Sequence, residues 1–231
     1  MGSTRIPVDD DDEVYFVGVS TVVTDVESRQ MLELGMVAFD RGFGEVASFE
    51  SIIVPPDLDA VAESAVPGPM DEWQRSGLWD DLVRVTNLGT ADKWSVSAVE
   101  ARACRWFDRV VGTDWATPMV GASVHMTRQT LATQMPELYE RFDFRSIDAT
   151  SFLLVAEECY QMPVELTRWR PGVVHRACDE IRDTVEAIGA SLGAVVLAHA
   201  EDIYPVGGNV GDVAARSVTR HRDGEATWRQ L

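Results

Sequence analysis

Apolar runs separated by short polar connections predict three strands in the first quarter of the chain. Residues 14–20 form an almost uninterrupted apolar run after an acidic leader, which is typical of a strand buried on both faces. Apolar residues dominate again at 31–39, and a third segment with strand character spans 45–54. Because the connections are short and residues 40–42 supply a turn, we expect the three strands to form an antiparallel meander.

Helical spacing becomes the main pattern after residue 55. Residues 55–80 are rich in proline, glycine and acidic residues, and we expect a surface loop that leads into short helices. Ser97 and Glu100 fit a capping box that opens a helix to about residue 111. Its expected apolar face consists of five residues at helical spacing: Val99, Ala103, Trp106, Phe107 and Val110.

Two further strands are predicted among the later helices. Residues 118–121 read as a short buried strand, and residues 144–148 as a fifth strand followed by a helix over 149–160. The last long helix begins near His175. Its expected buried stripe recurs every three or four residues: Cys178, Ile181, Val185, Ile188 and Leu192.

The order of these elements predicts the fold class and the domain organisation. Three strands, then helices, then strands alternating with helices indicate an α/β fold, with a mixed five-stranded sheet flanked by helices. We expect residues 1–12 to be a disordered acidic leader and residues 13–198 to form one domain. Residues 199–231 lose their periodicity and are expected to be a flexible tail.

The charge of the chain restricts its partners. The 231 residues carry a formal net charge of −18, and such a field repels a long phosphate backbone. A short oligonucleotide held in a local pocket remains compatible with this charge. The three cysteines lie far apart in apolar helical contexts, which favours buried reduced thiols in a cytoplasmic protein. No apolar run is long enough for a transmembrane helix, so we expect no membrane partner and no signal peptide.

Five segments of the chain carry a more specific pattern. They are Met31-Leu32-Glu33-Leu34-Gly35 through Asp40, Met70-Asp71-Glu72-Trp73, Gly121-Ala122-Ser123, Met135-Pro136-Glu137-Leu138 followed by Phe144-Arg145-Ser146-Ile147-Asp148, and His175-Arg176-Ala177-Cys178-Asp179-Glu180-Ile181-Arg182. In this order and spacing they resemble oligoribonuclease, of the DEDDh 3′–5′ exonucleases with a ribonuclease H-like fold. The resemblance covers roughly residues 13–197 and implies that fold here.

The resemblance also implies a chemistry. Members of the family hold two divalent metal ions on four carboxylates and cleave the terminal phosphodiester with a metal-activated water. Two Mg²⁺ or Mn²⁺ ions need several hard oxygen ligands and enough negative charge to offset their own. A histidine beside the metals then acts as general base on the water.

The chain departs from this pattern at the metal ligands. Where the family has Asp-x-Glu in the first strand, this chain has Gly18 and Ser20, and Thr127 stands in the place of the third acid. Glu180 fills the fourth position and His175 the position of the base. We therefore expect a degenerate centre that uses no metal cofactor, with His175 and Glu180 as remnants. The competing interpretations are that His175 makes only a structural hydrogen bond, and that Asp179 and Glu180 stabilise the N-terminus of the helix through its dipole.

One alternative keeps the activity. Asp25-Val26-Glu27 is a second Asp-x-Glu, so an active 3′–5′ exoribonuclease with relocated ligands would use Mg²⁺ or Mn²⁺ there. This pair lies much closer to the second strand than the family spacing requires, which favours a connecting loop.

The nucleotide pocket is better matched than the metal centre. By position, residues that contact a short RNA in the family correspond to Trp73, Ser123, Arg145, Thr150 and Ser151. Phe144 takes the place of a tyrosine that the partner subunit supplies, and Thr24 that of a leucine wedge. The structural alternatives are that Trp73 packs a loop against the core, that Ser123 is an N-cap, and that Arg145 pairs with a surface acid.

These observations lead to one expectation and two alternatives. We expect a homodimeric pseudo-exonuclease that binds short RNA or dinucleotides without hydrolysing them. The alternatives are the active enzyme and a purely structural or regulatory dimer that serves a protein partner.

Overall fold

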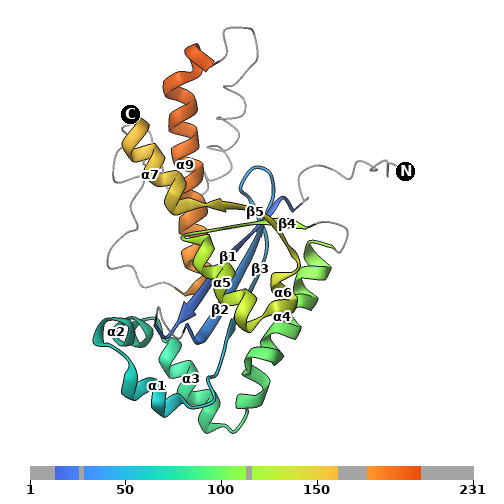
Figure 1. Ribbon diagram of the computed structural model, residues 1–231, viewed down its shortest axis with the longest axis vertical. Coiled ribbons are helices and arrows are strands. Elements are labelled where there is room, and N and C mark those ends of the chain that lie inside the picture. The colour runs from blue at the N-terminus through green and yellow to red at the C-terminus, as the bar shows by residue number, and fades with distance from the viewer. Residues whose placement is uncertain (1–13, 26–28, 113–115, 161–175, 204–231) are drawn as a thin grey trace.

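The computed structural model describes residues 14–25, 29–112, 116–160 and 176–203, and these residues build one five-stranded sheet (Figure 1). The strands follow the order β3-β2-β1-β4-β5. Their bounds are Phe16–Val23 for β1, Met31–Phe39 for β2, Glu45–Ile52 for β3, Thr117–Gly121 for β4 and Phe142–Asp148 for β5. The first three strands pair antiparallel, whereas β4 runs parallel to β1 and β5 parallel to β4. This confirms the predicted α/β fold with a mixed sheet, which is consistent with a ribonuclease H-like exonuclease.

The helices fill the connections from β3 to β4 and from β4 to β5, and two more of the described helices follow β5. Their bounds are α1 (Leu58–Ser64), α2 (Pro67–Arg75), α3 (Leu78–Asn87), the 3₁₀ helix η1 (Ala91–Trp94), α4 (Val96–Val110), α5 (Val124–Gln134), α6 (Pro136–Tyr139), α7 (Ala149–Tyr160) and α9 (Ala177–Ile203). Helices α7 and α9 lie side by side, and α9 also contacts the four strands β1 to β4 (Figure 1). In the part of the chain that is described, no helix has both the length and the apolar character needed to cross a bilayer.

Strand β1 is buried on both faces, as the apolar run predicted. Val17 and Val19 belong to a core cluster formed with α4, α5 and α6, whereas Phe16 belongs to a second cluster formed with α7 and α9. The alternation follows from the two-residue period of a strand. Because β1 is the central strand, both layers of helices are anchored on it.

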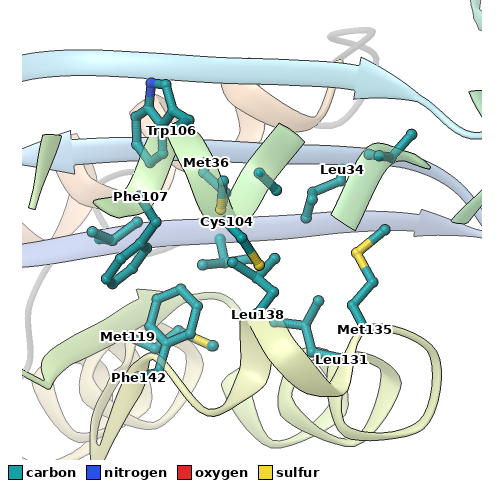
Figure 2. Packing of buried hydrophobic residues seen from close by; sticks show 14 of the residues in the cluster. Leu34, Met36, Cys104, Trp106, Phe107, Met119, Leu131, Met135, Leu138 and Phe142 are labelled. Carbon is teal, nitrogen blue, oxygen red and sulfur yellow. The ribbon is translucent and has the colours of Figure 1, made fainter. Parts of the chain in front are cut away.

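The first of these clusters is the larger one. Figure 2 shows Phe107 of α4 facing Phe142 of β5, with the side chains of α5 and α6 closing the space around them. The two rings meet edge to face with their centroids 5.0 Å apart. Cys104 lies in the same cluster, and burial raises the pKa of its thiol to about 11. The expected burial of this cysteine is therefore confirmed.

A separate apolar cluster joins the three short helices to the ends of β2 and β3. Trp73 is only 4% exposed in this cluster, and its ring stacks on that of Trp79 at 6.3 Å. The expected passage from a loop into short helices is confirmed, with α1 beginning at Leu58.

Three details differ from the sequence-based expectations. The side chain of Ser95, not that of Ser97, accepts the N-cap hydrogen bond of α4 from the amide of Ala98, and Glu100 accepts from the amide of Glu137 instead. The predicted capping box is therefore wrong.

Leu192 is 37% exposed and does not belong to the buried stripe of α9. Helix α9 ends at Ile203, past the predicted domain boundary at residue 198, and the leader 1–12 lies outside the described residues.

Candidate functional site

Gly18 lies in the middle of β1, on the face that α9 covers. A Cβ atom placed on this glycine would come closer than 3.0 Å to Cγ2 of Ile181 and 3.2 Å from Cε2 of Phe39. Ile181 is 1% exposed and belongs to the second core cluster. The volume in which a side chain of residue 18 would begin is therefore occupied by an apolar side chain of α9.

Ser20 lies two residues further along the same face and contacts the remaining carboxylate. Its hydroxyl donates a hydrogen bond of 2.6 Å to Oε2 of Glu180. Ser20 is only 7% exposed, so this bond is largely shielded from water. The structure thus brings together two of the positions matched to metal ligands, as a donor and an acceptor joined to each other.

The other positions of the expected centre lie in other elements or outside the described residues. Thr127 lies in α5 and is 7% exposed. His175 and Glu27 lie outside the described residues, so their placement relative to Glu180 stays a prediction. Asp25 accepts a hydrogen bond of 3.2 Å from the hydroxyl of Thr24. Over the described ranges, no group of three or more His, Cys, Asp or Glu side chains could hold a metal ion.

The described residues do not fit a pair of divalent cations. Such a pair requires several carboxylates that converge on one volume. On β1 a glycine and a serine replace them, an isoleucine fills the space beside the glycine, and the hydroxyl of Ser20 donates to the one matched carboxylate. We therefore derive no chemical step through metal ions at this position.

Three of the matched nucleotide-contacting residues, Ser123, Thr150 and Ser151, lie where β4 and β5 end and two helices begin. Trp73 lies apart from them, buried in α2, so it packs against the core as the structural alternative expected. Ser123 precedes α5 with a φ of 51°, a left-handed conformation, and makes no side-chain cap to its helix. Its amide donates to the hydroxyl of Thr150 at 3.2 Å, and the two hydroxyls lie 3.4 Å apart. The predicted N-cap role of Ser123 is therefore wrong as a side-chain interaction, and Ser123 faces Thr150 instead.

Asp148 holds this arrangement in place. Its two carboxylate oxygens accept from the amide of Val124 at 2.8 Å and from the amide of Ser151 at 2.9 Å. One side chain at the end of β5 thus satisfies an early amide of α5 and an early amide of α7, which otherwise lack intrahelical partners. His125 lies at the same corner, with Nδ1 4.0 Å from Asp148, and its side chain is 77% exposed.

Arg145 and Phe144 lie on the edge strand next to this corner. The guanidinium of Arg145 donates to both carboxylate oxygens of Asp143, at 3.0 and 3.1 Å, and this hydrogen bonding lowers the pKa of Asp143. Arg145 therefore does pair with a surface acid. Phe144 is 89% exposed, which is unusual for a large aromatic side chain.

Two structural contributors were not anticipated from the sequence. Ile181 was expected to be only a core residue, and no local pattern indicates that it fills the space beside Gly18. Arg128 of α5 donates to the hydroxyl of Ser146 at 2.8 Å and to the carbonyls of Asp143 and Arg145, and so fixes α5 to β5. A single arginine in a helix carries no signal for such a contact.

Comparison with known proteins supports the family assignment. No protein-family model matches the chain. It is 28% identical over 176 residues to the oligoribonuclease of Thiobacillus denitrificans, covering 70% of this chain and 83% of that protein. It is 28% identical over 179 residues to the oligoribonuclease of Acinetobacter baylyi (68% and 88%) and 24% identical over 165 residues to that of Nocardia farcinica (71% of each). Together with the mixed five-stranded sheet, these similarities support an oligoribonuclease-like exonuclease family.

Proposed function

We propose that this protein is a catalytically degenerate member of that family, which binds short oligoribonucleotides or dinucleotides without cleaving them. The observation that carries the proposal is the filled volume beside Gly18, because Ile181 lies where a metal-binding side chain would begin.

Electrostatics support the same proposal. Two divalent cations bring four positive charges into a confined volume, and they are stable there only when several carboxylates offset them. Of the four positions matched to acids, only residue 180 carries a carboxylate. That carboxylate is partly buried and accepts a hydrogen bond from Ser20, so it is already in use within the fold.

The corner formed by Ser123 and Thr150, with Arg145 on the adjoining strand, supports the binding half of the proposal. Two hydroxyls and an amide lie together there, and a guanidinium lies on the adjoining strand. Hydroxyls, amides and arginine are the groups that contact phosphate in most nucleic-acid complexes. Because Arg145 pairs with Asp143 in the free protein, a bound phosphate would have to replace that carboxylate. The net charge of −18 favours short ligands over long ones.

Calorimetric titration with a 5′-phosphorylated diribonucleotide in EDTA tests the binding half. We expect binding without metal ions, and Arg145→Gln should weaken it about tenfold or more through loss of a charge-assisted contact. Arg105→Gln on α4 makes the same charge change at an exposed position and should leave binding unchanged. If the wild-type protein shows no binding below millimolar concentrations, this half of the proposal is wrong.

We also propose that the protein is a homodimer. The support is the exposed Phe144 on the edge strand β5, at the position where the resemblance expects a residue that reaches into a partner's pocket. Light scattering after size exclusion should give twice the chain mass of 25.5 kDa, and Phe144→Ser should shift the equilibrium toward the monomer. A wild-type monomer at micromolar concentration would contradict the dimer.

The state of the thiols supports the further proposal that the protein acts in the cytoplasm. Cys104 and Cys178 are buried and free, as is common in reducing compartments.

A further inference from the structure

We propose that the face of β1 on which the resemblance places metal ligands has become the joint that fixes α9 to the sheet. In the strand register, Gly18 is opposite Val37 and Ser20 is opposite Gly35. These four residues lie on one face of the sheet because their side chains follow the two-residue period. Helix α9 begins above this patch, with Ala177, Cys178 and Ile181 toward it.

Two glycines on neighbouring strands permit the close approach. A Cβ atom on Gly35 would lie 2.7 Å from the carbonyl carbon of Ala177 and 2.8 Å from the amide nitrogen of Cys178. These are backbone atoms, so they cannot move aside without shifting the helix. At Gly18 the obstacle is the side chain of Ile181. The first turns of α9 therefore pack against two positions without side chains, Gly18 and Gly35.

Carboxylates on the same face bind the first turn of α9. Glu33 of β2 accepts from the amide of Ala177 at 2.9 Å and from Nε of Arg176 at 2.6 Å. Glu50 of β3 accepts from the amide of Cys178 at 3.0 Å. Acids near a helix N-terminus satisfy its orphan amides and complement its dipole.

A further polar contact comes from α9 itself. Glu180 accepts from Ser20 of β1 at 2.6 Å, so strand and helix also exchange a hydrogen bond beside the Gly18–Ile181 contact. The carboxylates at this joint thus connect the sheet to a helix. In this packing a side chain at residue 18 would have to displace Cγ2 of Ile181, so the two compete for one volume. The inference rests on packing alone and holds whether or not the protein binds nucleotides.

Urea unfolding of Gly18→Ala, Ile181→Ala and the double variant tests the joint. Gly18→Ala should lower the midpoint because the new methyl group meets Ile181. In the Ile181→Ala background the same methyl group enters vacated space, so the double variant should unfold at a higher midpoint than Ile181→Ala alone. If Gly18→Ala does not fold, recovery of a folded protein in the double variant gives the same answer.

Gly189→Ala provides the matched control. It adds the same atom within α9, where nothing lies within 4 Å of the new Cβ. It should leave the midpoint unchanged or raise it, since alanine favours a helix. If Gly18→Ala lowers the midpoint equally in both backgrounds, or not at all, the joint is not formed as proposed.

The Ser20–Glu180 contact provides a second readout that does not depend on a clash. Ser20→Ala and Glu180→Gln should each lower the midpoint, and their combination should cost less than the sum of the two shifts. Strict additivity would overturn the polar part of the joint. If the unfolding midpoints contradict the joint and no turnover is detected, the joint is wrong and the proposed function is retained. If the midpoints support the joint and turnover is detected, the proposed function is wrong and the joint is retained.

Discussion

Asp108 on α4 and Arg141 before β5 form a bidentate ion pair, with Nε–Oδ1 and Nη2–Oδ2 distances of 2.7 and 3.0 Å. Hydrogen bonding to Arg141 is the main cause that lowers the pKa of Asp108 below its ordinary value of 3.8. A carboxyl whose pKa falls on folding adds stability above its unfolded pKa. That stability is lost as the pH drops through the folded pKa.

We therefore expect Asp108→Asn to lower the free energy of unfolding by about 0.5 kcal/mol at pH 7, a small value because both side chains are about one-third exposed. The difference from wild type should shrink as the pH falls below 3.8, the ordinary pKa of the group. Urea titrations between pH 7 and pH 3 measure it, with the exposed Asp71→Asn as control. A deficit that is constant with pH would contradict the assignment.

Cys178 leads to a prediction about thiol chemistry. Burial raises the pKa of its thiol to about 12, and the pKa of Cys104 is raised to about 11 by the same cause. Roughly one in a thousand such thiols or fewer is ionised at pH 8, and only the thiolate is reactive. In a Cys159→Ser variant we expect no reaction with Ellman's reagent in the native state and two thiols in urea. Fast labelling of the native protein would show that this part of the core opens readily.

At the scale of elements, Asp148 joins the beginnings of α5 and α7. The side chain in Asp148→Asn has the same shape, but its NH₂ group would face one of the two backbone N–H donors and could not accept from it. We expect the free energy of unfolding to fall by about 1 kcal/mol, the net contribution of one hydrogen bond, because the Asp148 side chain is 23% exposed and water can reach the amide of Ser151. Diribonucleotide binding should weaken as well, because Ser123 and Thr150 would lose their alignment. An Asp148→Asn variant with unchanged urea midpoint and affinity would contradict this role, and Asp71→Asn again serves as control.

The elements themselves were largely predictable, and the exceptions have a common cause. The bounds of β2 and α7 follow from the apolar pattern, because each element is long and uniformly patterned. The cap of α4 was misassigned because two serines lie two residues apart at its start, Ser95 at the N-cap and Ser97 already inside the helix. Glu100, the expected partner of Ser97, accepts from the amide of Glu137 instead. Local sequence does not contain that contact.

At the scale of the whole molecule, the sequence predicted which acids are missing but not what replaced them. The loss at Gly18, Ser20 and Thr127 can be seen from matched positions alone. That Ile181 fills the space, and that Glu180 bonds to Ser20, depends on how a late helix docks on the first strand. Such long-range packing follows from the tertiary fold and has no signature in local periodicity.

The protein should not hydrolyse RNA with divalent metal ions, and turnover of a 5′-phosphorylated diribonucleotide in Mn²⁺ tests this most directly. Chromatography of the products should show no more hydrolysis with the wild-type protein than with His175→Ala or Glu27→Gln, each purified in the same way. Wild-type turnover at about 1 s⁻¹ or faster would be typical of an enzyme. If such turnover occurs and His175→Ala abolishes it, the protein is an active exoribonuclease and not a degenerate one. Loss of that turnover in Glu27→Gln would assign the metal ligands to the alternative acids.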